Sequence, residues 1–229
     1  MAVDVRFLGQ ACFEITSGGA SLLIDPFLTG NPKAAAEASE LNPDVILLTH
    51  GHADHLGDTV DIAKRTGATV VAIVELAAEI GQDGVENVVD PNYGGTVTFD
   101  WGWIKLVPAW HTAVSPNGTP HMPAGLLIHI GDHTIYHLGD TCLFSDMQLI
   151  ARRGDRIDLA LVPIGGHYTM DRFDAVTAVE FVRPDQVIPC HYNTYPPIEA
   201  DAQAFKQDVQ NAGFSEVIVL DPGQSHTVK

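Results

Sequence analysis

The sequence predicts an α/β protein with four layers, an αββα sandwich in which two mixed β-sheets pack face to face and helices cover both outer surfaces. Alternation of apolar and polar residues opens the chain and returns after Gly94, which indicates two separate β-meanders. Each meander is followed by continuous apolar strands that alternate with helices, as in parallel sheets buried on both faces. A doubly wound sheet or a barrel does not accommodate two meanders, whereas two packed mixed sheets do.

The first meander and its strand–helix units occupy the first third of the chain. The pair Gly18-Gly19 turns the second strand into the third. The apolar run at 45–48 is typical of a strand buried on both faces, and Gly67 fits the end of a helix. The expected elements are strands at 3–8, 12–16, 20–24, 45–48 and 69–74, helices at 57–66 and 75–80, and one or two helical turns within 33–40.

The second meander is again followed by strands and helices. The pair Gly131-Asp132 predicts a hairpin turn, and Ser145 is placed to cap a helix that runs to Arg152. Pro184 and Gly213 lie just beyond the ends of two further helices. The expected elements are strands at 96–99, 103–108, 124–130, 134–138, 159–162, 186–189 and 217–220, a short final strand, and helices at 145–152, 171–182 and 201–211.

Length and composition restrict the class of protein. The chain has 229 residues and no low-complexity linker, so residues 1–229 are expected to form a single domain with a sizeable core. Its three cysteines cannot close a disulfide framework. The N-terminus lacks the features of a signal peptide, and no apolar run approaches the roughly 18–20 residues of a membrane span. These features predict a cytoplasmic protein without a membrane partner.

The charge balance restricts the partners. Twelve Lys and Arg oppose 29 Asp and Glu, which gives a formal net charge of −17. A field of this sign repels long nucleic acids and anionic membrane surfaces. The expected partner is therefore a small-molecule substrate, including an anionic one if a metal site receives it. The composition leaves homo-oligomerisation open.

The strongest chemical signal is the segment Thr49-His50-Gly51-His52-Ala53-Asp54-His55, directly after the buried strand at 45–48. In extended backbone His50 and His52 point the same way. Where a helix starts, Asp54 and His55 diverge by about 100°, so they can serve a neighbouring point. One loop can thus hold two metals side by side. Packing three imidazoles and a carboxylate here without a cation would be costly.

Four ligands do not complete two metal sites, so further donors are expected at the ends of other strands. His111, Asp140 and His191 each follow an expected strand. Each therefore occupies the C-terminal edge of a strand, where ligands gather in α/β proteins.

This arrangement resembles the metallo-β-lactamase superfamily from the opening meander to His191. Within it, the chain is similar to the small bacterial metal-dependent hydrolases, which are related to ascorbate-6-phosphate lactonases and N-acyl-phosphatidylethanolamine phospholipase D. The segments that carry the resemblance, besides the histidine motif, are Asp25-Pro26-Phe27-Leu28-Thr29-Gly30-Asn31-Pro32, Gly139-Asp140-Thr141 with Phe144-Ser145-Asp146-Met147, and His191-Tyr192-Asn193-Thr194.

The resemblance implies two divalent metal ions, with Zn expected first and Mn, Fe or Ni also compatible with these ligands. It assigns one metal to His50, His52 and His111, and the other to Asp54, His55 and His191, with Asp140 bridging both. Two such cations share a water, lower its pKa and polarise the substrate oxygen. Asp54 would also orient the resulting hydroxide as a catalytic residue. Asp25 is expected to fix the orientation of a ligand histidine, the alternative being an ordinary Asp-Pro turn.

Other residues carry less defined expectations. Relatives often have a histidine after the first glycine, whereas Gln10 stands here. His167, in a glycine-rich loop, is a candidate catalytic residue for substrate contact or leaving-group protonation, the alternative being a surface histidine. His121 is a candidate for the mouth of the site. The remaining histidines are expected in sheets or turns. Three further residues near ligands are expected in the core, namely Trp110, Cys142 and Cys190, and the alternative for Trp110 is a wall of the pocket beside His111.

The expected function is metal-dependent hydrolysis of an ester, lactone or phosphodiester of a small molecule. One alternative is an iron-dependent oxidoreductase similar to persulfide dioxygenases, which oxygen uptake at a mononuclear site would distinguish. Another is a phosphodiesterase or nuclease for small nucleotides, because Asp140 and His191 lie too close in sequence for the extra domain of the larger nucleases. A further alternative is a protein that binds metal without catalysing a reaction.

Overall fold

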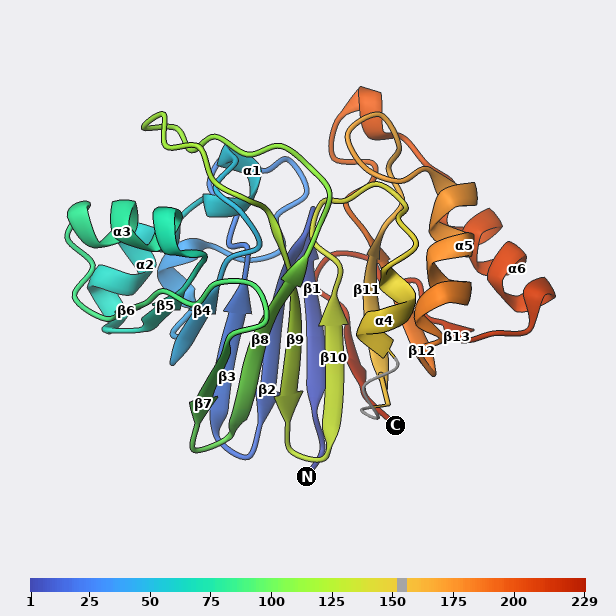
Figure 1. Cartoon of the computed structure of the whole chain (residues 1–229), viewed down its shortest axis with the longest axis horizontal. Coiled ribbons are helices and arrows are strands. Elements are labelled where there is room, and N and C mark those ends of the chain that lie inside the picture. The colour runs from blue at the N-terminus through green and yellow to red at the C-terminus, as the bar shows by residue number, and fades with distance from the viewer. Residues whose placement is uncertain (152–155) are drawn as a thin grey trace.

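Two seven-stranded mixed sheets pack face to face, with helices on the outside, in the computed structural model of the protein, which describes residues 1–151 and 156–229 (Figure 1). This arrangement confirms the predicted four-layer αββα sandwich. Helices α2 and α3 lie beside the first sheet, and helices α5 and α6 lie beside the second (Figure 1). That residues 1–229 form one domain stays a prediction.

The first sheet joins the opening meander to parallel strands. The first three strands run antiparallel to one another, and the strands from β3 to β6 run parallel. In spatial order the strands are β14 (Ser225–Thr227), β1 (Asp4–Gly9), β2 (Cys12–Ser17), β3 (Ala20–Ile24), β4 (Val45–Leu47), β5 (Thr69–Val71) and β6 (Val88–Val89). The accompanying helices are η1 (Ala38–Glu40), α1 (Ala53–Leu56), α2 (Thr59–Thr66) and α3 (Val74–Gln82).

The second sheet repeats this plan with the second meander. Strands β7 to β10 are antiparallel, and β10 to β13 are parallel. In spatial order the strands are β13 (Glu216–Val217), β12 (Gln186–Cys190), β11 (Leu159–Pro163), β10 (His133–His137), β9 (Ala124–Ile130), β8 (Gly102–Pro108) and β7 (Thr96–Phe99). The helices are α4 (Met147–Ala151), α5 (Arg172–Val182), η2 (Pro196–Ile198) and α6 (Ala202–Ala212).

The core lies in two layers because successive side chains of each strand face opposite sides of a sheet. On β9, Leu126 and Ile128 enter the cluster shared by the two sheets, while Leu127 enters the cluster beneath the outer helices. Strand β11 divides in the same way, with Leu161 inside and Val162 outside. A strand buried on both faces therefore needs a continuous apolar sequence, and such apolar runs are what predicted the buried strands from the sequence.

The helix expected at 57–66 is α2 (Thr59–Thr66), and a separate short helix, α1 (Ala53–Leu56), precedes it. Gly57 ends α1 with a φ of +43°, and α2 begins at Thr59. A Cβ at Gly57 would lie 2.3 Å from the carbonyl oxygen of Pro26, so the close approach of the Asp25-Pro26 loop requires glycine there. The break separates α1, which carries Asp54 and His55, from the rest of the helical segment.

Other boundaries differ by a few residues. Asp171 and Asp201 each cap a helix by accepting hydrogen bonds from two backbone N–H groups, so both starts were placed correctly. The strand expected at 69–74 ends at Val71, because Val74 begins α3. The two-residue strand β6 was not predicted. Of the helical turns expected within 33–40, the short helix η1 is present. The expected helix end at Arg152 lies outside the described residues.

Among the core expectations, Cys190 is buried, whereas Cys142 and Trp110 are exposed. Trp110 is 66% exposed because β8 ends at Pro108 and the chain leaves the sheet before reaching it. None of the helices in the described ranges is both long and apolar enough to cross a lipid bilayer.

Candidate metal centre

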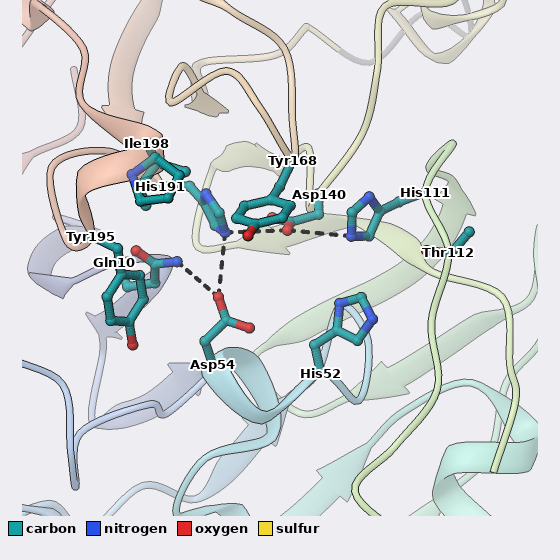
Figure 2. Close-up of a pocket in the computed structure, with 11 residues that line it drawn as sticks. Gln10, His52, Asp54, His111, Thr112, Asp140, Tyr168, His191, Tyr195 and Ile198 are labelled. Carbon is teal, nitrogen blue, oxygen red and sulfur yellow. Dashed lines mark hydrogen bonds and ion pairs between the residues drawn. The ribbon is translucent and has the colours of Figure 1, made fainter. Parts of the chain in front are cut away.

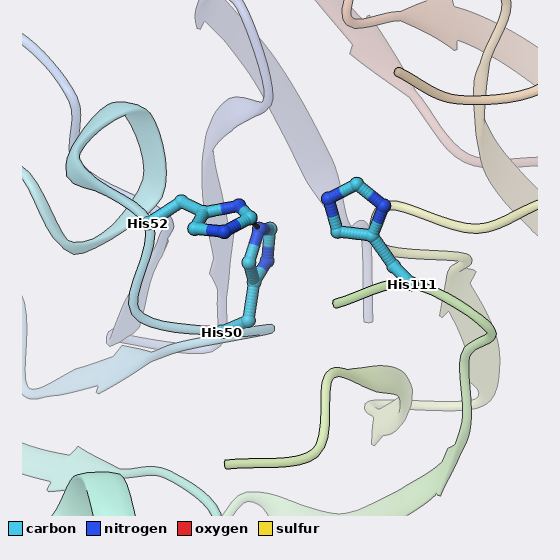
Figure 3. A group of neighbouring side chains, drawn as sticks. All are labelled: His50, His52 and His111. Atoms are coloured by element: carbon cyan, nitrogen blue, oxygen red, sulfur yellow. Dashed lines mark hydrogen bonds between the residues drawn. The ribbon is translucent and has the colours of Figure 1, made fainter. Parts of the chain in front are cut away.

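The histidine motif lies where β4 leaves the first sheet and α1 begins. His52 is the residue that precedes α1, and its backbone is extended, with φ −61° and ψ 151°. His50 and His52 therefore project to the same side, and Figure 3 shows their rings together with that of His111. Asp54 and His55 lie in the first turn of α1 and face a second point. The local geometry is the one that the spacing predicted.

The remaining candidates come from the second sheet. His111 follows β8, Asp140 follows β10, and His191 follows β12 directly. The two sheets meet at this edge, so side chains as far apart in sequence as His50 and His191 converge. Figure 2 shows Asp54, His111, Asp140 and His191 directed towards one cavity.

The ligand atoms form overlapping clusters that Asp140 links. His50, His52 and His111 form one group, Asp54, His55 and His191 form another, and His50, His55 and Asp140 form a third, each with its ligand atoms within 4.8 Å of one another. Asp140 Oδ2 lies 3.2 to 4.0 Å from the Nε2 atoms of four histidines, which are His191, His55, His111 and His50. Two nitrogen or oxygen ligands of a tetrahedral zinc ion lie about 3.3 Å apart.

Several of these atoms are buried and lack a hydrogen bond within the described part of the chain. They are His55 Nε2, His191 Nε2 and Asp140 Oδ1. A buried polar atom without a partner destabilises the folded state. A bound cation would satisfy such atoms, and imidazole and carboxylate are ligands of Zn, Mn, Fe and Ni alike. The donor set therefore fits divalent metal ions.

The carboxylate and the histidines also shift one another's ionisation. Burial raises the pKa of Asp140, but the nearby His191 and His55 outweigh it and hold that pKa well below its ordinary value. Burial lowers the pKa of His55 and His191. Asp140 together with Asp54 nevertheless raises the pKa of His191 to about 9, and Asp140 together with Asp25 raises that of His55 well above its ordinary value. The site thus keeps a buried anion that attracts positive charge. A metal cation would take the place of these protons.

Asp25 lies behind His55 rather than in an isolated turn. Its Oδ2 lies 2.8 Å from His55 Nδ1 and accepts a hydrogen bond from the Thr49 hydroxyl at 2.6 Å, while its Oδ1 accepts from the Thr49 backbone N–H at 2.8 Å. All three residues are buried. An Nδ1–H bond to Asp25 leaves Nε2 of His55 free to face the cluster. This contact is the one expected of a residue that orients a ligand histidine.

The sequence predicts His121 at the mouth of the site, but it lies instead beneath the loop that carries His50 and His52. Its Nε2 accepts a hydrogen bond from the Gly51 backbone N–H at 2.8 Å, and its Nδ1 lies 3.0 Å from the Thr119 carbonyl oxygen, which accepts. A Cβ at Gly51 would lie 2.8 Å from the His121 ring. His121 therefore supports the turn between His50 and His52 from below.

Gln10 contacts two of the candidate ligands, although it is far from both in sequence. Its Nε2 donates to Asp54 Oδ2 at 2.9 Å, and its carbonyl oxygen accepts from the His191 backbone N–H at 2.7 Å. The side chain is buried, and the residue adopts a φ of +56°. Sequence reasoning noted Gln10 only as a departure from relatives, because its partners lie on other loops.

A cavity of about 460 Å³ opens over the cluster, a volume typical of a small-molecule site. Its lining includes Tyr168 and Tyr195, which sequence reasoning did not single out. His167 is exposed and does not line the cavity, but its ring packs edge-on against Tyr168 with centroids 4.4 Å apart. The residues that line the cavity are Gln10, His52, Asp54, His111, Thr112, Asp140, Tyr168, His191, Tyr195, Pro197 and Ile198.

Comparison with known proteins agrees with this arrangement. A model of the β-lactamase superfamily domain matches residues 4–191. A UPF0173 metal-dependent hydrolase from Thermus thermophilus is 48% identical over 223 residues, covering 97% of this chain and 97% of that protein. A counterpart from Methanopyrus kandleri is 45% identical, covering 97% and 98%. Among solved structures, a metallo hydrolase from the archaeon Ignicoccus hospitalis superposes with a TM-score of 0.91 at 37% identity, covering 100% of this chain and 99% of that one.

Proposed function

The chain belongs to the β-lactamase superfamily and, within it, to the UPF0173 metal-dependent hydrolases, and from this premise we propose that it hydrolyses a small-molecule ester, lactone or phosphodiester at a pair of divalent metal ions. One observation carries the proposal. Asp140 lies between two histidine groups, and its Oδ2 is within 4.0 Å of histidines from both. A single metal ion does not need a carboxylate shared in this way.

The clusters support the ligand assignment that the resemblance implied. His50, His52 and His111 would hold one metal, Asp54, His55 and His191 the other, and Asp140 both. Zn is the expected metal, with Mn, Fe and Ni as alternatives. Bound there, the pair supplies an activated water and polarises the substrate oxygen.

The chain's own residues would direct that chemistry. Asp54 lies at the edge of the cavity with Oδ2 3.6 Å from His191 Nε2, so it can accept a hydrogen bond from the attacking water and orient it. Asp25 holds His55 in place through Nδ1. Leaving-group protonation by His167 stays a prediction, because its ring packs against Tyr168 but does not line the cavity.

Chelation tests the proposed function directly. Dialysis against a chelator is expected to remove hydrolysis of model esters, lactones and phosphodiesters, and reconstitution with two equivalents of Zn, Mn, Fe or Ni in separate samples is expected to restore it. Metal content measured by mass spectrometry should approach two ions per chain. Hydrolysis that persists at full rate in the metal-free protein would contradict the proposal.

The same samples distinguish the alternatives. The iron-loaded protein is tested for oxygen uptake with glutathione persulfide, which an oxidoreductase would consume and a hydrolase would not. Short linear and cyclic nucleotides test the phosphodiesterase alternative. Metal binding without turnover of any of these substrates would favour a binding role.

A further inference from the structure

We propose that the substrate is a neutral carboxylic ester or lactone whose uncharged apolar group lies between Tyr168 and Tyr195. This inference rests on the proposed function and specifies its substrate class. It narrows the expected small-molecule substrate, which could have been anionic, to an uncharged one, because the lining of the described cavity has no Lys or Arg to pair with a charge on the substrate.

The cavity has a polar floor and an apolar wall. The floor consists of the candidate metal ligands, including Asp54 and Asp140. The wall comes from two loops of the second sheet: the loop between β11 and α5 supplies Tyr168, and the segment after β12 supplies Tyr195, Pro197 and Ile198. Tyr168 is 55% exposed and Tyr195 36% exposed, so part of each residue is open to a ligand. Aromatic rings bind apolar and aromatic groups by stacking and burial.

Positive side chains are missing from this wall. Of the described residues that line the cavity, none is Lys or Arg. A phosphate or carboxylate remote from the metals would thus meet the tyrosines and apolar side chains of the wall, with no ion-pair partner to offset its desolvation. Arginine and lysine are the usual partners of such groups. The fixed charges therefore disfavour a substrate with an anionic tail.

The polar groups of the wall are neutral. Burial, and after it the charge of Asp54, raises the pKa of Tyr195, so its hydroxyl stays protonated at neutral pH. Thr112 adds another hydroxyl. Such groups can donate to an ester or ether oxygen without requiring a charge on the ligand.

A matched pair of substrates tests the substrate class. Methyl 4-acetoxybenzoate and 4-acetoxybenzoate share the acetyl ester and differ by one remote charge, and the release of acetate is measured so that only cleavage of the shared ester is counted. With the metal-loaded protein, kcat/KM is expected to be at least about tenfold higher for the neutral ester, the loss an unpaired buried charge would cause. Equal rates, a preference for the anion, or a preference for bis(4-nitrophenyl) phosphate would overturn the assignment. Failure to hydrolyse any of them would instead refute the proposed function.

Variants locate the specificity. Tyr168→Ala and Tyr195→Ala are each expected to lower the ratio of kcat/KM for methyl 4-acetoxybenzoate to that for methyl acetate by roughly fivefold to tenfold. The matched control is Phe173→Ala, an exposed aromatic outside the cavity, which should leave the ratio unchanged. Saturation-transfer NMR with methyl 4-methoxybenzoate and metal-free protein gives a readout without turnover. The signal should weaken in both tyrosine variants, and an undiminished signal would overturn the proposal.

A separate observation carries a second inference: we infer that Gln10 is a positioning residue for the metal held by Asp54, His55 and His191. It is tied to two of these three ligands, by its side chain to Asp54 and by its carbonyl oxygen to the backbone of His191. Its amide nitrogen must face the carboxylate, because the reverse orientation would place two acceptor oxygens together. Its Oε1 is buried without a partner in the described residues. The Asp54 bond is therefore the one hydrogen bond that fixes this side chain.

Titration with Co(II), followed by absorption, tests this role because it reports on each metal without turnover. Gln10→Met keeps the length of the side chain and removes the donor. It is expected to lower the affinity for the metal at Asp54, His55 and His191 tenfold to a hundredfold. The affinity for the metal at the other site is expected to stay unchanged. Gln203→Ala, on the exposed face of α6, is the control. Equal weakening of both metals, unchanged binding, or a single metal in the wild-type protein would overturn the inference.

Discussion

Asp140→Asn is expected to remove metal-dependent hydrolysis, with kcat lowered about a thousandfold or more. The wild-type carboxylate lies within 4.0 Å of four histidine nitrogens. An asparagine of the same size is neutral and would direct an N–H donor at atoms that must themselves face the metals. A shared metal pair contributes several kcal/mol of transition-state stabilisation, which corresponds to a rate loss of this order.

The measurement is metal content together with kcat on any substrate the wild-type protein turns over. Metal content is expected to fall below one ion per chain. Asp146→Asn provides the matched control, since Asp146 is exposed in the same loop and its carboxylate accepts a hydrogen bond from the Ser145 hydroxyl rather than facing the cluster. Two bound ions and a kcat within threefold of wild type would show that Asp140 does not bridge the metals.

Asp25→Ala is expected to lower the free energy of unfolding of the metal-free protein by about 3–5 kcal/mol. The substitution leaves a buried His55 without the carboxylate that lies 2.8 Å from its Nδ1, and it leaves the Thr49 backbone N–H and hydroxyl without their acceptor. Breaking a buried pair by removing one partner costs energy on this scale, and each orphaned donor adds to it.

Urea unfolding in the presence of a chelator measures this loss without a contribution from bound metal. Asp100→Ala, in the exposed turn between β7 and β8, should change the free energy of unfolding by less than about 0.5 kcal/mol. Metal affinity should also fall in Asp25→Ala, because His55 loses its orientation. A stability equal to that of the control would mean that the contacts of Asp25 with His55 and Thr49 do not stabilise the folded protein.

The fold and the clustering of the candidate metal ligands were predictable from the sequence because their signals are local. Period-two alternation and continuous apolar runs identified the strands, and the spacing of His50, His52, Asp54 and His55 is visible within one segment. His111 and His191 followed from the rule that ligands gather at strand ends. Asp25 was recognised only through the resemblance, since an Asp-Pro turn by itself does not indicate a partner.

The supporting residues were not predictable because their partners lie on other loops. Gln10 meets Asp54, and His121 meets Gly51, through contacts between segments that neither period nor spacing relates. Tyr168 enters the cavity in place of its neighbour His167, which has a φ of +54°. A residue with left-handed backbone conformation changes the direction in which the neighbouring side chains point, and no pattern of residue types predicted this conformation at His167.

The position of the cluster at the seam between the sheets has a consequence for the whole molecule. His50 and His55 follow a strand of the first sheet, whereas Asp140 and His191 follow strands of the second. A metal pair held by all of them is a non-covalent cross-link that closes a long loop of chain, as a disulfide would. The free energy of metal binding would then contribute directly to the stability of the packing between the two sheets. A substitution deep in the inter-sheet core would loosen the metal without touching a ligand.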